Sequence, residues 1–286
     1  MSFLSWRLPA LLCLAVVATS ALASPPELVT VGDADNASDV TGYGAVPYEY
    51  KIGKFEVTNE EYCEFLNAVA KSDPHGLYDN RMGEWNPDAD RWGGIERSGS
   101  PGSYTYAVIS GCGKRPVNFV TWESAARFCN WLTGGETETG VYALKDGLGR
   151  LKLPRHSELA GGEKASWAIA SEDEWYKAAY FDPKKAGKAG YWRFPGRSDS
   201  AHDANLSTHQ PSEVGKAGPA SAYGTFDQGG NLWEYVESRY GDQVGLRGGS
   251  FFLNDNPGYM ESTTRYDVYS AKWPNYGFRV VSLGGK

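Results

Sequence analysis

Two acidic side chains, Asp227 and Glu234, flank a segment in which Gly229 and Gly230 leave the backbone free to bend. Carboxylate oxygens and main-chain carbonyl oxygens form the oxygen-only ligand sets that hard cations such as calcium prefer. The residues alone also allow a second interpretation, an Asx turn leading into a strand in which Glu234 caps a neighbouring group. The segment is therefore either a cation site or a structural turn.

Two residues are weak candidates for a catalytic nucleophile. Ser250 follows two glycines, and Cys112 lies in the Gly-Cys-Gly-Lys loop 111–114, where a neighbouring lysine could lower the pKa of the thiol. No histidine or carboxylate stands at a spacing that would place a base beside either of them. We therefore assign no catalytic residue from the sequence.

A run of aromatic residues interleaved with Asn, Asp and Arg extends from residue 251 to residue 276. Aromatic rings with polar neighbours suit the recognition of glycans or peptides. The same rings could instead fill loops over a small core, and both interpretations stay open. The residues of the expected ligand pocket are Phe252, Asn254, Tyr259, Arg265, Tyr266 and Trp273.

The N-terminus has the pattern of a secretory signal peptide. Arg7 precedes an apolar run over residues 8–17, and small residues at Ala21 and Ala23 stand before Ser24. Residues 1–23 are thus expected to be removed, and the mature protein to be secreted or periplasmic. The alternative is an anchor that is never cleaved. No later stretch approaches the roughly 20 apolar residues of a membrane span, so none is expected after cleavage.

The cysteines and histidines show no metal-binding pattern. There is no C-x-x-C pair, and the four histidines, His75, His156, His202 and His209, are scattered through loop-like sequence. A preformed zinc site is therefore not expected. After signal removal Cys63, Cys112 and Cys129 remain, which allows one disulfide at most. Buried free thiols are the alternative, and the pairing stays open.

Composition excludes several classes of protein. The 286 residues are 41% hydrophobic and 14% aromatic, which is enough for a sizeable core. A net charge of -7 makes a nucleic-acid-binding surface unexpected. The chain has 35 glycines and 10 tryptophans but only 3 methionines. This composition favours a fold with many turns and buried aromatic side chains over a helical bundle.

Three short amphipathic helices are predicted, over 58–69, over 121–132, and from Ser171 to about residue 181. Capping boxes are expected at the first and third, formed by Thr58 with Glu61 and by Ser171 with Glu174. Strands are predicted at 48–57, 117–120, 246–252 and 278–282, so that the two ends of the chain could meet in one sheet. Long polar loops are expected over 71–111 and 183–222.

Single residues of these elements also carry expectations. Arg279 should make an ion pair at a sheet edge. Four tryptophans should fill core rather than bind ligand, namely Trp122, Trp131, Trp175 and Trp233.

Six motifs in order carry a resemblance: FEVTNEEY at 55–62, RPVNFVTW at 115–122, SEDEWYKAA at 171–179, GGNLWEY at 229–235, LRGGSF at 246–251 and GFRV at 277–280. The chain resembles the formylglycine-generating enzyme, or sulfatase-modifying factor, family. The resemblance implies an α+β fold, a single compact C-type-lectin-like domain low in regular secondary structure. We expect it over residues 47–283, after a lead-in at 24–46.

The resemblance also implies a structural calcium ion. Its ligands would be the side chains of Asp227 and Glu234 and main-chain oxygens near Gly229, Gly230 and Leu232. A second calcium of the family would use Asn205 and residue 206 with an acidic loop. Residues 212–215 lack the expected aspartate, so this second ion is not expected.

One departure from the family concerns the chemistry. The family enzyme oxidises a substrate cysteine with O₂ and copper held by two cysteines, whose places fall at or near Leu253 and Gly258. Cu(I) needs thiolates, so copper is not expected here. The expected function is a calcium-stabilised binding or accessory module for an extracytoplasmic protein, peptide or glycan. The alternative is an O₂-dependent oxidoreductase that modifies a cysteine or tyrosine of a peptide.

Overall fold

The computed structural model describes residues 25–144, 155–202, 204–205, 208–252 and 256–285. The expected signal peptide, residues 1–23, lies outside them. No helix within these residues is long and apolar enough to cross a bilayer.

Both ends of the domain meet in one four-stranded antiparallel sheet. Its order is β1 (Leu28–Val31), β2 (Tyr50–Gly53), β14 (Val280–Leu283) and β7 (Ser166–Ile169). Val281 pairs with Ile52 on one side and with Ala168 on the other. The last strand of the chain is therefore an inner strand, and the prediction that the two ends share a sheet is confirmed.

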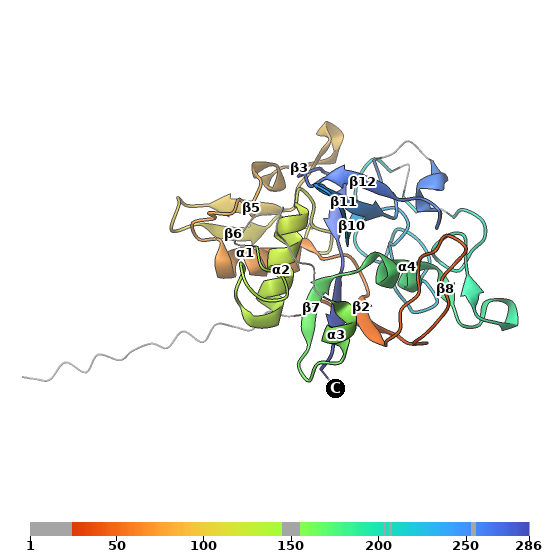
Figure 1. The fold of residues 1–286 in the computed structure, drawn as a ribbon. Coiled ribbons are helices and arrows are strands. Elements are labelled where there is room, and N and C mark those ends of the chain that lie inside the picture. The colour runs from red at the N-terminus through yellow and green to blue at the C-terminus, as the bar shows by residue number, and fades with distance from the viewer. Residues whose placement is uncertain (1–24, 145–154, 203, 206–207, 253–255, 286) are drawn as a thin grey trace, which may run out of the picture.

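A second four-stranded sheet has the order β12 (Tyr266–Tyr269), β11 (Gln243–Arg247), β10 (Trp233–Tyr240) and β13 (Tyr276–Phe278). β13 runs parallel to β10, whereas β10, β11 and β12 pair antiparallel. β12 is an edge strand of this sheet, which lies above α4 in Figure 1.

The regions expected as long loops contain short hairpins. Residues 71–111 include β3 (Trp85–Asn86) with β4 (Arg91–Trp92), and β5 (Ile95–Ser98) with β6 (Thr105–Val108). The 3-10 turn η1 (Asn80–Gly83) precedes β3, and η2 (Pro87–Ala89) connects β3 to β4. The second region begins after β8 (Phe181–Asp182) and contains η4 (Lys185–Gly187) and β9 (Gly190–Tyr191), while η5 (Pro257–Met260) follows later.

The three predicted helices are confirmed as α1 (Asn59–Val69), α2 (Trp122–Gly134) and α4 (Glu172–Tyr180). Both predicted capping boxes form, at Thr58 and at Ser171. Gly135 ends α2 in the left-handed conformation, at φ 83°. A fourth helix, α3 (His156–Ala160), was not predicted, and no side chain caps its N-terminus.

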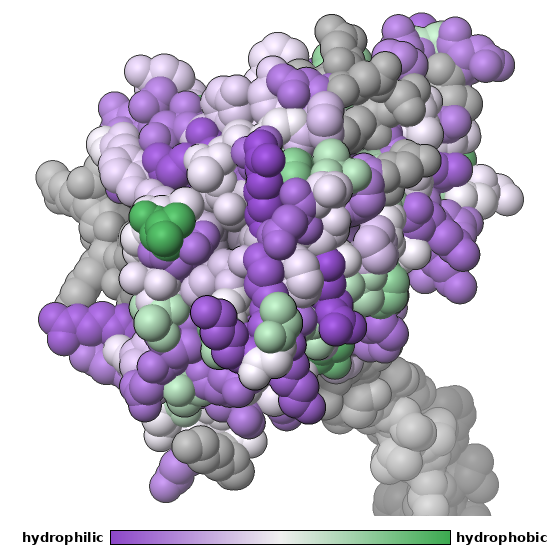
Figure 2. Space-filling view, turned by 90° about the vertical axis from the view of Figure 1, so that its right-hand side faces the viewer, coloured by the Kyte–Doolittle hydropathy of each residue, from purple (hydrophilic) through white to green (hydrophobic). Residues whose placement is uncertain are grey.

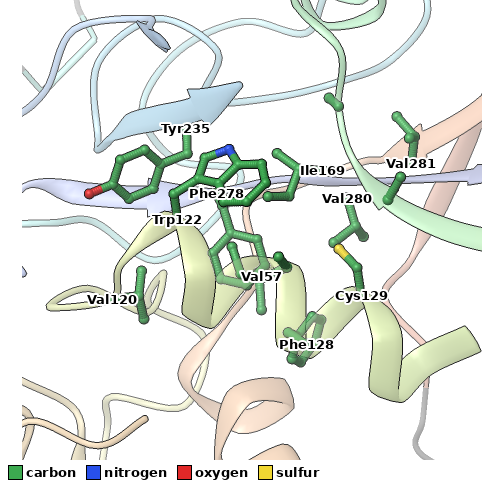
Figure 3. Packing of buried hydrophobic residues seen from close by; sticks show 14 of the residues in the cluster. Val57, Val120, Trp122, Phe128, Cys129, Ile169, Tyr235, Phe278, Val280 and Val281 are labelled. Atoms are coloured by element: carbon green, nitrogen blue, oxygen red, sulfur yellow. The ribbon is translucent and has the colours of Figure 1, made fainter. Parts of the chain in front are cut away.

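The core fills the space between α1, α2 and the sheets. Figure 3 shows Trp122, Phe128 and Cys129 of α2 facing Ile169, Phe278 and Val280. Trp122, Trp175 and Trp233 are buried and Trp131 is half-buried against the same cluster, as predicted. Figure 2 shows that the face on the α4 side is mostly hydrophilic, with apolar residues only scattered over it.

One predicted strand is corrected by the structure. The strand predicted at 117–120 does not form, because Phe119 adopts φ 55° and only Pro116 makes an isolated bridge, to Thr58. Residues 28–31, expected in a lead-in before the domain, form β1 and pair with β2 along its whole length. β1 is therefore part of the first sheet.

Candidate functional site

An aromatic cleft of about 200 Å³ opens on one face of the second sheet. Side chains two residues apart on a strand share a face, and the register places Leu246 opposite Tyr266 and Trp233 opposite Tyr276. Leu246 pairs with Tyr235, two residues from Trp233, so the cleft is built on one face of the sheet by side chains from all four strands in neighbouring rows. It is lined by Trp233, Leu246, Tyr259, Tyr266, Val268, Asn275 and Tyr276.

The aromatic rings that line the cleft pack against one another. The ring centroid of Trp233 lies 5.2 Å from that of Tyr266 and 5.7 Å from that of Tyr259. Trp233 is 3% exposed, whereas Tyr266 is 44% exposed at the rim. The cleft thus offers a mainly apolar surface that is already formed without a ligand.

Asn275, the polar residue of the cleft, connects it to Ser250. Asn275 Nδ2 donates to Ser250 Oγ over 3.2 Å. Gly249 has φ 78°, and a Cβ there would lie 3.1 Å from Tyr259 Cβ, so glycine lets the chain turn against Tyr259. Among the described residues no histidine or carboxylate bonds to Ser250 Oγ, so the structure shows no base beside this candidate nucleophile.

Of the six residues expected in the ligand pocket, Tyr259 and Tyr266 line the cleft. Phe252 instead packs on Trp92, with ring centroids 5.3 Å apart. Arg265 does not line it, because its guanidinium is bound to Glu172 and Asp267.

Trp273 lines a separate hollow of about 290 Å³ beside Phe119. Asn254 lies outside the described residues. The sequence analysis did not place Trp233, Leu246, Val268, Asn275 or Tyr276 in the pocket. Side chains alternate between the two faces of a strand, and this alternation is the sequence signal that could have identified residues on the same face.

The three cysteines of the described residues, Cys63, Cys112 and Cys129, are free and buried. Burial raises the pKa of Cys112, and the charge of Arg115 offsets only part of that rise. The causes of this shift do not include a lysine. Burial raises the pKa of Cys129 well above its usual value and that of Cys63 to about 11.

Asp227 and Glu234 bind different partners. Glu234 is fully buried and accepts two hydrogen bonds from the guanidinium of Arg279, at 2.7 Å and 3.0 Å, and one from Trp175 Nε1 at 2.7 Å. Asp227 accepts the backbone amides of Gly215 and Ala217. Arg279 makes the predicted ion pair, although it lies in the core rather than at an exposed edge.

These contacts do not fit the calcium site that the resemblance implies. Both oxygens of Glu234 are occupied, and Arg279 supplies the positive charge there. The part of the chain that the structure describes contains no group of three or more acidic, histidine or cysteine side chains suited to a metal. The side chain of Asn205 binds Ser212 and Asn231.

A second charged cluster lies around His156 of α3. Its Nδ1 is 2.8 Å from Glu174 Oε2, and its Nε2 is 3.1 Å from Glu237 Oε1. Burial disfavours the charged imidazole, but the two carboxylates outweigh it and raise the pKa of His156 well above its usual value. The ring is therefore an imidazolium ion that joins α3 to α4 and β10.

The architecture is that of a single C-type-lectin-like domain. Residues 29–283 match the family described as the sulfatase-modifying factor enzyme 1-like domain. The chain belongs to this family, as the motifs indicated, and the predicted fold is confirmed.

Solved structures support the fold. PvdO from Pseudomonas aeruginosa is 18% identical, with a TM-score of 0.53 over 90% of this chain and 94% of that one. CarF is 20% identical, with a TM-score of 0.53 over 91% of this chain and 98% of that one.

One curated relative matches part of the chain. The alpha-1,4-glucan:maltose-1-phosphate maltosyltransferase 2 of Streptomyces coelicolor is 37% identical over 99 residues, which are 31% of this chain and only 14% of that protein.

Proposed function

We propose that the chain is a binding domain that acts outside the cytoplasm and holds an extended peptide through an apolar side chain. The aromatic cleft carries this proposal, because it is a preformed, mainly apolar hollow on one face of a sheet. Its volume of about 200 Å³ suits one side chain. The signal-like residues 1–23 support a place of action outside the cytoplasm.

The edge position of β12 favours a peptide over a glycan. Tyr266 and Val268 line the cleft and belong to the strand that ends the sheet. An edge strand presents unpaired main-chain groups to which an extended peptide can add as a further strand. A sugar ring has no main chain with which to extend the sheet, so the edge strand gives it no such advantage.

The peptide prediction is tested with capped five-residue peptides that differ at the central position, Tyr, Leu or Ser. We expect the Tyr and Leu peptides to bind and the Ser peptide to bind far more weakly, measured by tryptophan fluorescence or calorimetry. Tyr266→Ala should weaken binding about tenfold, because a rim aromatic anchor is lost.

Tyr269→Ala is the matched control. Tyr269 belongs to the same strand and is 69% exposed, but it does not line the cleft, so binding should stay nearly unchanged. N-methylation of alternate peptide amides should weaken binding if a strand is added. Equal binding by the Ser peptide, or saturable binding of oligosaccharides in place of the peptides, would contradict the proposal.

We further propose that the domain does not generate formylglycine. Leu253 and Gly258 stand where the family places its copper-binding cysteines, and the thiols that remain have raised pKa values, which disfavours thiolate ligands. After incubation with copper and a Cys-x-Pro-x-Arg peptide in air, mass spectrometry should show no aldehyde. If an aldehyde forms and Cys112→Ser abolishes its formation, the proposal is wrong and the chain is an oxidase.

A further inference from the structure

We propose that a hollow between α3, α4 and the segment before β2 is a second binding site, for a primary ammonium group on a short aliphatic stem. The hollow measures about 350 Å³. It shares no residue with the aromatic cleft. Figure 1 shows α3 beside β2 and β7, below the sheet that carries the cleft.

Two carboxylates of the wall have an oxygen without a partner. Glu237 Oε1 accepts from Tyr142 Oη at 2.7 Å and contacts His156, whereas its Oε2 accepts no hydrogen bond from any described residue. The side chain of Glu237 is only 8% exposed. Asp173 Oδ1 accepts the Gly44 amide at 2.8 Å, and within the described ranges its Oδ2 accepts none. Both residues line the hollow, and neither oxygen is among the buried polar atoms that lack a partner in the described chain. A ligand that brings N–H groups into the hollow can therefore bind them.

Among the described residues, negative charge exceeds positive charge at the wall of the hollow. His156 contacts the carboxylates of Glu174 and Glu237, and Asp173 is a further acid of the lining. Arg155 lies at the wall, but its guanidinium is bound to Glu158 in an exposed pair. No lysine or arginine of the described chain lies within ion-pair distance of Asp173 or Glu237.

The pKa of Asp173 agrees with this excess. Burial, together with the neighbouring charges of Glu172 and Glu174, raises it, although the Gly44 amide and Arg247 act against the rise. A bound cation would remove part of that cost.

The rest of the wall fits an aliphatic stem. Ala45, Val46 and Pro47 supply apolar surface, and Tyr48 adds an aromatic ring. Apolar walls beside carboxylates suit an alkylammonium ion better than a hydrated metal ion, which prefers oxygen ligands all round. Both a free amine and a lysine side chain carry this chemistry.

The test uses the full chain and two probes, n-pentylamine and N-acetyl-lysine methylamide, with n-pentanol as the uncharged control. Saturation-transfer NMR and calorimetry should show saturable binding of the amines at millimolar concentration and none of pentanol. Asp173→Asn keeps the acceptor for Gly44 and removes the charge, so it should weaken amine binding at least about fivefold. Tighter binding of the lysine derivative would point to a peptide-borne lysine, and tighter binding of pentylamine to a free amine.

Glu158→Gln is the matched control, because Glu158 is an acid on α3 whose side chain is 67% exposed and paired with Arg155. It should leave amine binding within about twofold. The proposal is overturned if neither amine binds, if pentanol binds as well as pentylamine, or if Asp173→Asn binds like the unmodified chain while its circular dichroism shows an intact fold. Tyr266→Ala should weaken peptide binding and leave amine binding unchanged, so the two proposals are tested separately.

Discussion

Replacing Glu234 by Gln is expected to lower the free energy of unfolding by about 3–5 kcal/mol. The substitution keeps the shape of the side chain but removes the charge that pairs with Arg279, which is fully buried. A buried guanidinium without its anion is strongly destabilising. Urea unfolding followed by circular dichroism measures the change.

Unfolding measurements with and without calcium distinguish the two roles of Glu234, ion-pair partner of Arg279 or calcium ligand. If the carboxylate acts as the partner of Arg279, the loss of stability in Glu234→Gln should be the same in chelator and in calcium. A loss seen only in calcium, or calorimetric calcium binding that the substitution abolishes, would show that Glu234 is a metal ligand. Lys54→Gln, which breaks an exposed pair with Glu27, is the control and should cost less than about 1 kcal/mol.

His156 should make the stability of the fold depend on pH. Its pKa in the folded protein lies well above the value of about 6.5 expected in the unfolded chain. The stabilisation is therefore fully present below about pH 6.5 and decreases as the pH rises through the folded pKa. His156→Gln should remove this pH dependence and cost about 3–5 kcal/mol at neutral pH, since two buried carboxylates lose their cation.

Unfolding of both proteins between neutral and alkaline pH measures this effect, together with NMR titration of the imidazole. His75→Gln serves as control, because His75 contacts Glu138 with a third of its side chain exposed and should contribute less than about 1 kcal/mol. An imidazole that titrates near its ordinary pKa in the folded protein would refute the charge assignment.

Local signals in the sequence predicted local structure well. Thr58 with Glu61 and Ser171 with Glu174 are three residues apart, so a short segment contains the whole capping box. Phe119 marks the limit of such signals. The residues around it have the pattern of a strand, but Phe119 itself adopts a left-handed conformation. Its amide donates to the carbonyl of Trp273, more than 150 residues away in the chain.

The parts that could not be predicted depend on contacts between distant segments. α3 has no capping side chain, and His156 is held by Glu174 and Glu237, 18 and 81 residues later. Tyr259 and Tyr266 were predicted as pocket residues because they belong to a segment rich in aromatic residues. Trp233 and Tyr276 belong to the same cleft only because β10 pairs parallel with β13, a register that no short motif encodes.

The inner position of β14 has a consequence for biosynthesis. β2 and β7 acquire their common partner only when residues 280–283 have been made, so these residues must leave the ribosome before the first sheet can close. A nascent chain that ends before residue 280 exposes the edges of both strands. Such edges promote aggregation, so products that terminate before residue 280 should depend on chaperones and proteases for their removal, whereas a chain that includes β14 can close the sheet.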